Sequence, residues 1–279
     1  MVATVSVREP AVAGMFYPQD RNVLTHEVDA LLRRADLKKI DGELRGLISP
    51  HAGYIYSGYT AANGYKLLQG KNFETVVIIG PSHREYFRGI SIFPGSAYRT
   101  PLGLLEVDDA LRSEMIRDGG VIFSSILGHR EEHAVEVQLP FLQRVLGQFK
   151  ILPIVMGDQG REYCLLLGEK LAEVLNGKKV LLVGSTDLSH YHSYDVACEL
   201  DRIIIEDVRD YSEDRLLNDL EMHRAEACGG GPMAATLIAS KKLGADSVEI
   251  LHYCNSGDVT GDREGVVGYL SAAVVRRRK

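Results

Sequence analysis

The chain has 279 residues, of which 45% are hydrophobic and 25% charged, and its formal net charge is −6 at pH 7. This mild acidity argues against general nucleic-acid binding, which requires a basic surface. Glycine and proline follow no period, which excludes a collagen-like chain. The four cysteines form no CxxC pair, the first residues lack signal-peptide regions, and no apolar run is long enough for a membrane span. These features predict a cytoplasmic protein that keeps its thiols reduced.

Helix-like and strand-like segments alternate along the chain. By apolar spacing we expect helices at residues 20–35, 56–68, 108–117, 139–146, 162–175, 195–209, 212–218 and 232–242. We expect strands at residues 46–49, 75–79, 89–93, 121–123, 151–155, 180–183, 247–254 and 266–275. This alternation predicts a single α/β domain over residues 1–279, with a mainly parallel central sheet and helices on both faces.

Three of the predicted strands end directly before residues that can do chemistry. The residues are His51, His83, Asp187 and His190, the last two on one turn. Ligand sites in open α/β sheets form at the carboxyl ends of the strands, so we expect these side chains to meet at one edge. Neutral imidazoles on short turns are good ligands for iron, zinc or copper, which makes a metal site the first hypothesis.

A third metal ligand would have to come from elsewhere in the chain, and Cys228 is the candidate. It lies in a glycine-rich segment that precedes the helix expected from residue 232. A helix N-terminus lowers the pKa of a thiol toward the thiolate that a metal binds, and glycines let the backbone approach a site closely. The alternative is that Cys228 is a small buried residue beside a packing turn.

A second polar cluster covers residues 128–138. His129 and His133 are four residues apart and would share one face of a helix, but the HExxH spacing of metalloproteases is absent. We expect either a solvated helix start or a cleft wall in which His133 and Glu136 bind substrate. Tyr54, near the first histidine motif, is a further candidate for binding a ligand, with core packing as the alternative.

A hydrolase is a third possibility, because one loop contains all the residue types of a Ser-His-Asp triad. Ser185 and Ser189 lie beside Asp187 and His190. Crowding on a single loop disfavours the relay geometry, and no GxSxG motif is present to expose a serine.

Six motifs occur in an order that resembles the Memo family. They are REPAVAGMFYP at 8–18, PHAGYIYSG at 50–58, GPSH at 80–83, EHAVEVQLPFLQ at 132–143, STDLSHY at 185–191 and ACGGGP at 227–232. The resemblance spans nearly the whole chain. Prokaryotic members of the family are component B of the AmmeMemoRadiSam set, so the resemblance implies a functional link to the other proteins of that set.

The resemblance also implies a fold similar to class III extradiol dioxygenases, which use non-haem Fe(II). His51 and His83 match the two histidine ligands, and Cys228 matches the position where Memo proteins replace the carboxylate. His190 matches the acid/base residue, with Asp187 beside it. Fe(II) is therefore the first choice of metal, and copper or zinc are alternatives because a thiolate is a softer donor than a carboxylate.

The leading hypothesis is a metal-dependent oxidoreductase of unknown substrate. Its rival is a non-catalytic module that binds a small phenolic ligand or a (phospho)tyrosine-type peptide in the same cleft. Arg84, Arg88 and Arg130 lie near the motifs and would then pair with an acidic or phosphorylated group. In both cases the expected partner is a small molecule or a peptide, with no nucleic acid and no membrane.

Overall fold

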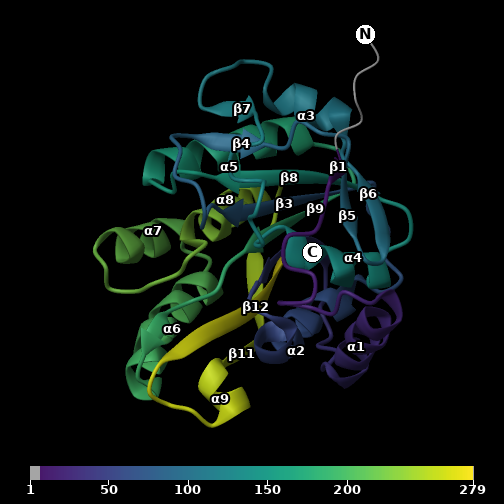
Figure 1. Ribbon diagram of the computed structural model, residues 1–279. Helices are drawn as coiled ribbons and strands as arrows, with labels where there is room; N and C mark the ends of the chain where they lie inside the picture. The colour runs from purple at the N-terminus through teal and green to yellow at the C-terminus, as the bar shows by residue number, and fades with distance from the viewer. Residues whose placement is uncertain (1–6, 279) are drawn as a thin grey trace.

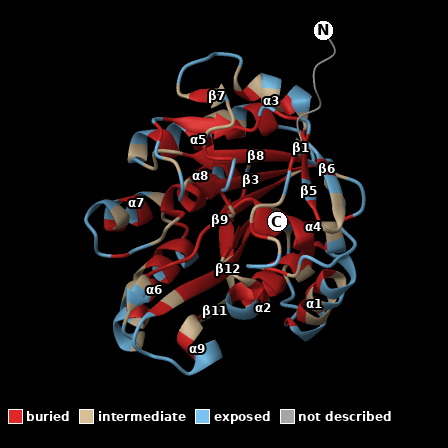
Figure 2. Cartoon of the chain, viewed as in Figure 1, coloured by how far each residue is buried: buried red, intermediate tan, exposed pale blue. Residues whose placement is uncertain are grey.

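Four parallel strands form the centre of the protein in a computed structural model that describes residues 7–278 (Figure 1). The four strands are β2 (Glu43–Ser49), β9 (Val180–Ser185), β3 (Thr75–Pro81) and β8 (Lys150–Met156), in this order across the sheet. Their runs of valine, isoleucine and leucine suit strands that are covered on both faces. All seven residues of β3 are buried, and Figure 2 shows this central region as continuously buried.

The predicted parallel centre is confirmed, and antiparallel strands flank it on both sides. Beyond β8, strand β4 is antiparallel to β8 and β7 is parallel to β4; beyond β2, strand β12 is antiparallel to β2 and pairs with β10 and β11. Only residues 256–265 join β11 to β12, fewer than a parallel crossover needs, so the chain returns antiparallel. The flanking strands are β4 (Ile90–Ile92), β7 (Ile122–Ser124), β10 (His190–His192), β11 (Ser247–Asn255) and β12 (Val266–Arg276).

Helices cover both faces of the sheet, as predicted. Alternate residues of β3 point to opposite faces: Val77 and Ile79 belong to one buried cluster, and Val76 and Ile78 belong to the other. The first cluster includes α3 (Asp109–Met115), α5 (Arg161–Leu175), α6 (Tyr194–Arg209), α7 (Glu213–Glu221) and α8 (Gly230–Lys242). The second includes α1 (Arg21–Arg34), α2 (Tyr54–Tyr65) and α4 (Leu139–Val145).

A few short elements have no counterpart among the predicted segments. A small separate sheet contains β1 (Val7–Arg8), β5 (Ala97–Thr100) and β6 (Gly103–Glu106), and helix α9 (Ser256–Thr260) follows β11. Two 3₁₀ turns, Lys66–Leu68 and Glu136–Gln138, extend α2 and precede α4. Elements this short are invisible to a periodicity search. Within residues 7–278 no helix combines the length and the apolar character that crossing a membrane requires.

Candidate metal site at the strand ends

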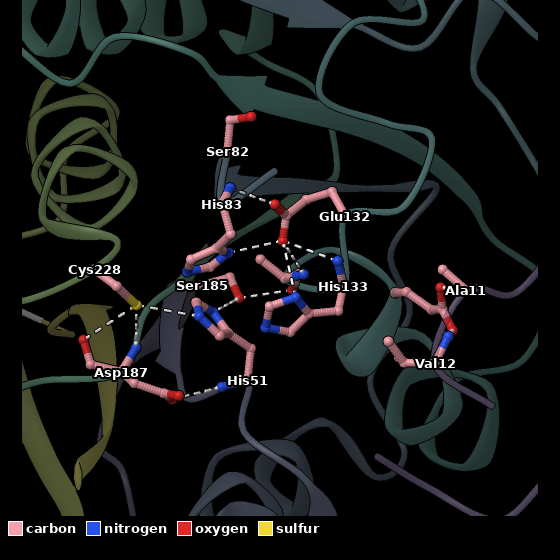
Figure 3. A network of polar contacts seen from close by, with 12 residues as sticks. Ala11, Val12, His51, Ser82, His83, Glu132, His133, Ser185, Asp187 and Cys228 are labelled. Atoms are coloured by element: carbon pink, nitrogen blue, oxygen red, sulfur yellow. Dashed lines mark hydrogen bonds and ion pairs between the residues drawn. The ribbon is translucent and has the colours of Figure 1, made fainter. Parts of the chain in front are cut away.

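The carboxyl ends of β2, β9 and β3 lie side by side and carry the motifs that the sequence singles out. β9 pairs in parallel with β2 on one side and with β3 on the other. His51, Asp187 and His83 follow these three strands and therefore converge at one edge of the sheet (Figure 3). The topology thus brings together groups that are far apart in the sequence.

His51, His83 and Cys228 bring their ligand atoms together at this edge. One ring nitrogen from each histidine and the Sγ of Cys228 lie within 4.8 Å of one another. Sγ lies 3.2 Å from Nε2 of His51, and the two imidazole rings stand nearly perpendicular with their centroids 5.0 Å apart. The His51 residue is only 1% exposed, whereas the His83 side chain is 28% exposed. The site is therefore closed on the His51 side and accessible on the His83 side.

Two local features hold Cys228 against β9. A Cβ on the next residue, Gly229, would lie 2.2 Å from the backbone oxygen of Ser185, so only glycine permits this approach. Asp187 also connects two of the site's segments: its backbone N–H donates to Sγ of Cys228 over 3.3 Å, and its Oδ1 accepts the backbone N–H of His51 over 2.8 Å. Asp187 therefore orders the Cys228 and His51 turns relative to each other.

Burial sets the protonation of both His51 and Cys228. The pKa of His51 lies well below its usual value because of burial and the neighbouring His83, so its imidazole is neutral. The pKa of the Cys228 thiol is raised, first by burial and then by the charge of Asp187. The sequence-based expectation of a lowered thiol pKa at a helix start is wrong, because burial and the carboxylate of Asp187 raise the pKa of Cys228.

His190, the expected acid/base residue, lies on β10 at the same side of the sheet. Its ring lies within electrostatic reach of both His51 and Asp187. Asp187 itself is fully buried, and burial raises its pKa. The Oδ1 of Asp187 is bonded to the backbone of His51, so an orienting role toward His190 stays a prediction.

Glu132 organises the accessible side of the site and was not singled out by the sequence. Its Oε1 accepts hydrogen bonds from Nδ1 of His83 (2.9 Å) and from the backbone of His133 (2.8 Å), and its Oε2 accepts the backbone N–H of His83 (2.6 Å). Burial acts to raise the pKa of Glu132, but these hydrogen bonds and the two histidines bring it down to about 2. Because an ionised carboxylate only accepts, Nδ1 of His83 is the donor in this hydrogen bond, and Nε2 is the ring nitrogen left for another partner. Nothing in the sequence separates this buried glutamate from its exposed neighbour Glu131.

The low pKa of Glu132 predicts an acid-dependent loss of stability. A carboxylate with a folded pKa of about 2, against an ordinary 4.5, stabilises the fold above pH 4.5 and loses this contribution as the pH falls toward 2. The difference corresponds to about 3 kcal/mol. In urea titrations from pH 7 to pH 2, Glu132→Gln should be less stable than the wild type at neutral pH. The difference in the free energy of unfolding between the two proteins should become smaller as the pH falls.

The matched control for this experiment is Glu131→Gln, which removes the adjacent, exposed carboxylate. It should leave the pH profile of stability unchanged. A gap between wild type and Glu132→Gln that is the same at every pH would contradict the assignment.

The structure separates the two histidines that helical spacing would place on one face. His129 is fully buried, its Nδ1 lies 2.7 Å from the hydroxyl of Tyr98, and burial lowers its pKa to about 3. His133 reaches the site: its ring centroid lies 4.7 Å from that of His83 and 5.2 Å from that of His51. Burial and then His51 lower the pKa of His133 to about 4, so it is a neutral group beside the candidate ligands. Substrate binding by His133 stays a prediction.

Glu136 and Tyr54 do not face open space, in contrast to the expected substrate contacts. Glu136 is completely buried, and its carboxylate pairs with Arg8 and accepts hydrogen bonds from the backbone of Ala11 and Val12, two residues visible at the right of Figure 3. The side chain of Tyr54 is packed in the core and donates its hydroxyl hydrogen to the backbone of Val137 over 2.7 Å. Both residues therefore have structural roles, Glu136 as the anchor of the N-terminal segment.

The fold and the site together define an α/β protein with a His-His-Cys cluster at the carboxyl edge of its sheet. A family model described as Memo-like protein matches residues 8–273. A MEMO1 family protein of Methanosarcina barkeri is 40% identical and one of Methanopyrus kandleri is 39% identical; the alignments cover 96% and 97% of this chain and 100% and 99% of those proteins. The chain belongs to the Memo family.

A solved structure supports the fold independently of close sequence similarity. The crystal structure of an uncharacterized protein from Escherichia coli K12 superposes with a TM-score of 0.58 at 14% identity. The match covers 83% of this chain and all of that one. At this identity the likeness concerns the fold alone.

Proposed function

We propose that the protein is a metal-dependent oxidoreductase whose metal is held by His51, His83 and Cys228. The observation that carries the proposal is the convergence of three ligand atoms, from three distant segments, within 4.8 Å. Fe(II) is the first candidate for the metal, with copper and zinc as alternatives. Two imidazoles and one sulfur suit these metals, whereas magnesium and calcium prefer oxygen ligands.

The protonation states of His51, His83 and Cys228 suit residues that bind such a metal. The pKa of His51 is held low, so its imidazole is neutral as a ligand must be. Nδ1 of His83 donates a hydrogen bond to Glu132, so Nε2 is the ring nitrogen available to a metal. Cys228 is a thiol in the metal-free protein and would lose its proton on binding. The thiolate would add negative charge to an otherwise neutral set of donors.

The other residues of the site would handle protons and position the substrate. His190 is partly exposed and lies within electrostatic reach of His51 and Asp187, which suits a group that exchanges a proton with substrate or solvent. His133 offers a neutral ring on the accessible side, next to His83. A bound iron or copper would supply the electron transfer that these side chains lack.

Metal analysis of protein purified without oxygen tests the proposal. Wild-type protein loaded with iron or copper should retain stoichiometric metal after desalting, and His51→Ala/His83→Ala should retain almost none. The control is His26→Ala/His223→Ala, which removes two exposed histidines. Equal and negligible metal in wild type and the His51/His83 variant, under both loading conditions, would refute the proposal.

A binding module for a phenolic or peptide ligand is the second candidate, and exposed aromatic side chains favour it. Tyr191 directly follows His190 and is 80% exposed, and Tyr86, three residues after His83, is 85% exposed. Peptides containing tyrosine or phosphotyrosine should then bind metal-free protein, and His190→Ala should keep this affinity. Loss of binding on removal of the metal would instead support the oxidoreductase.

The hydrolase alternative would need one of the two serines of the loop as its nucleophile. Ser185 and Ser189 are both completely buried. The hydroxyl of Ser185 donates its hydrogen to the backbone oxygen of Ala134 over 2.7 Å. Neither serine is therefore presented to a substrate.

A further inference from the structure

The two ring nitrogens of His51 have different neighbours. Nε2 faces Sγ of Cys228 at 3.2 Å, and Nδ1 faces Oγ of Ser185 at 2.9 Å. A neutral imidazole carries one proton, and the nitrogen without it is the one that can bind a metal. The partners of Ser185 decide which nitrogen this is.

Ser185 can only accept a hydrogen bond from His51. Its single hydroxyl hydrogen points at the backbone oxygen of Ala134 (2.7 Å), which is an acceptor and cannot donate. The amide Nε2 of Gln138 donates to the same Oγ over 2.8 Å. The remaining lone pair of Oγ faces His51, so Nδ1 of His51 must be the donor.

Gln138 is itself held in one orientation. Its Nε2 also donates to the backbone oxygen of Pro50 (2.9 Å), and its Oε1 accepts the hydroxyl hydrogen of Tyr65 (2.6 Å). A flipped amide would place oxygen against oxygen at Pro50. Burial raises the pKa of Tyr65, so the phenol keeps the hydrogen that it donates. Ser185, Gln138 and Tyr65 are all completely buried.

We infer that the chain Tyr65–Gln138–Ser185 holds His51 as its Nδ1–H tautomer and so keeps the Nε2 lone pair directed into the site. In the opposite tautomer Ser185 would turn its hydrogen to His51 and away from Ala134. The oxygen of Ala134 would then keep only a long contact of 3.4 Å from Nε2 of Gln138, which already donates to Ser185 and Pro50. The loss of a well-formed hydrogen bond by a buried carbonyl costs roughly 1–3 kcal/mol. The three residues are positioning residues that act through His51.

The two histidines are therefore held by unlike partners. Nδ1 of His83 donates its hydrogen bond to an ionised carboxylate, that of Glu132, whereas Nδ1 of His51 donates to a neutral hydroxyl, that of Ser185. A carboxylate partner makes an imidazole a stronger donor. In the proposed metal site, His83 would therefore be the more strongly donating of the two histidine ligands. This consequence rests on the proposed function.

Nitrogen-15 NMR of the histidine rings in metal-free protein tests the inference. The signals of His51 are assigned by their loss in His51→Ala. Wild-type protein should show the Nδ1–H tautomer for His51. In Ser185→Ala, which removes the acceptor of the Nδ1 hydrogen, the tautomer should change to Nε2–H and metal affinity should fall about 10–100-fold.

Ser240→Ala is the matched control, because Ser240 is a buried serine on α8 whose Oγ has no hydrogen-bond partner within residues 7–278. This substitution should change neither the tautomer of His51 nor the affinity for metal. Ser185→Thr keeps the hydroxyl and should keep the Nδ1–H tautomer.

An Nε2–H signal for His51 in the wild type would overturn the inference without any variant, as would an unchanged tautomer in a folded Ser185→Ala protein. Failure of the proposed function looks different. In that case the wild type would retain no metal, whatever the tautomer of His51.

Discussion

Replacing Arg8 by alanine is expected to lower the free energy of unfolding by about 3–5 kcal/mol, as measured by urea denaturation. The guanidinium of Arg8 is buried, pairs with the completely buried Glu136, and also donates to the backbone oxygens of His129 (2.9 Å) and Glu132. Its removal leaves a buried carboxylate without its counter-charge. The hydrogen bonds from Tyr17 and from the N-terminal backbone remain but supply no full charge.

The neighbouring ion pair provides the control for this experiment. Arg99 and Glu9 also join the N-terminal segment to the body of the protein, but their side chains are 45% and 64% exposed. Arg99→Ala should therefore cost less than about 1 kcal/mol. Equal losses in Arg8→Ala and Arg99→Ala would show that Glu136 does not depend on Arg8.

Replacing Cys228 by alanine is expected to weaken metal binding by roughly 100-fold or more, because even the loss of a residue behind a metal ligand typically costs 10–100-fold. The same change should alter the proton balance. Since the raised pKa keeps the thiol of Cys228 protonated, a metal bound by the proposed site would displace this proton. Each rise of one pH unit should therefore increase the metal affinity of the wild type about ten times more than that of Cys228→Ala.

Titration calorimetry under nitrogen, in buffers of different ionisation enthalpy, measures the protons released per metal. The control is Cys254→Ala, which removes a half-buried thiol that contacts Thr60 on α2. It should release as many protons as the wild type. The same proton count and affinity in Cys228→Ala as in the wild type would exclude the thiol as a ligand.

Most of the fold follows from the sequence because each long element carries its own periodicity. The predicted strand at residues 180–183 and the predicted helix at 162–175 agree with β9 and α5 to within two residues at each end. The small sheet does not follow, since β1 has two residues and gains its stability from pairing with β5, about ninety positions away. Local sequence does not encode such pairing.

The residues of the candidate site could likewise be predicted only in part. His51 and His83 could be predicted because each directly follows a buried strand, and parallel topology then requires them to meet. Glu132, Gln138 and Ser185 could not, because their roles depend on hydrogen bonds between segments at least 47 positions apart. The roles of these buried polar residues are set by which groups the fold places opposite them.

The order of the site residues along the chain has a consequence for biosynthesis. His51 and His83 lie in the first third of the protein, whereas Cys228 lies in the last fifth. At ordinary translation speeds the thiol leaves the ribosome on the order of ten seconds after the histidines. The emerging chain therefore carries, for a time, only two of the three proposed metal ligands, and a chain interrupted before Cys228 never acquires the sulfur. Because Cys228 and its glycine-rich turn lie late in the chain, completion of the proposed ligand set is one of the last steps in the synthesis of the protein.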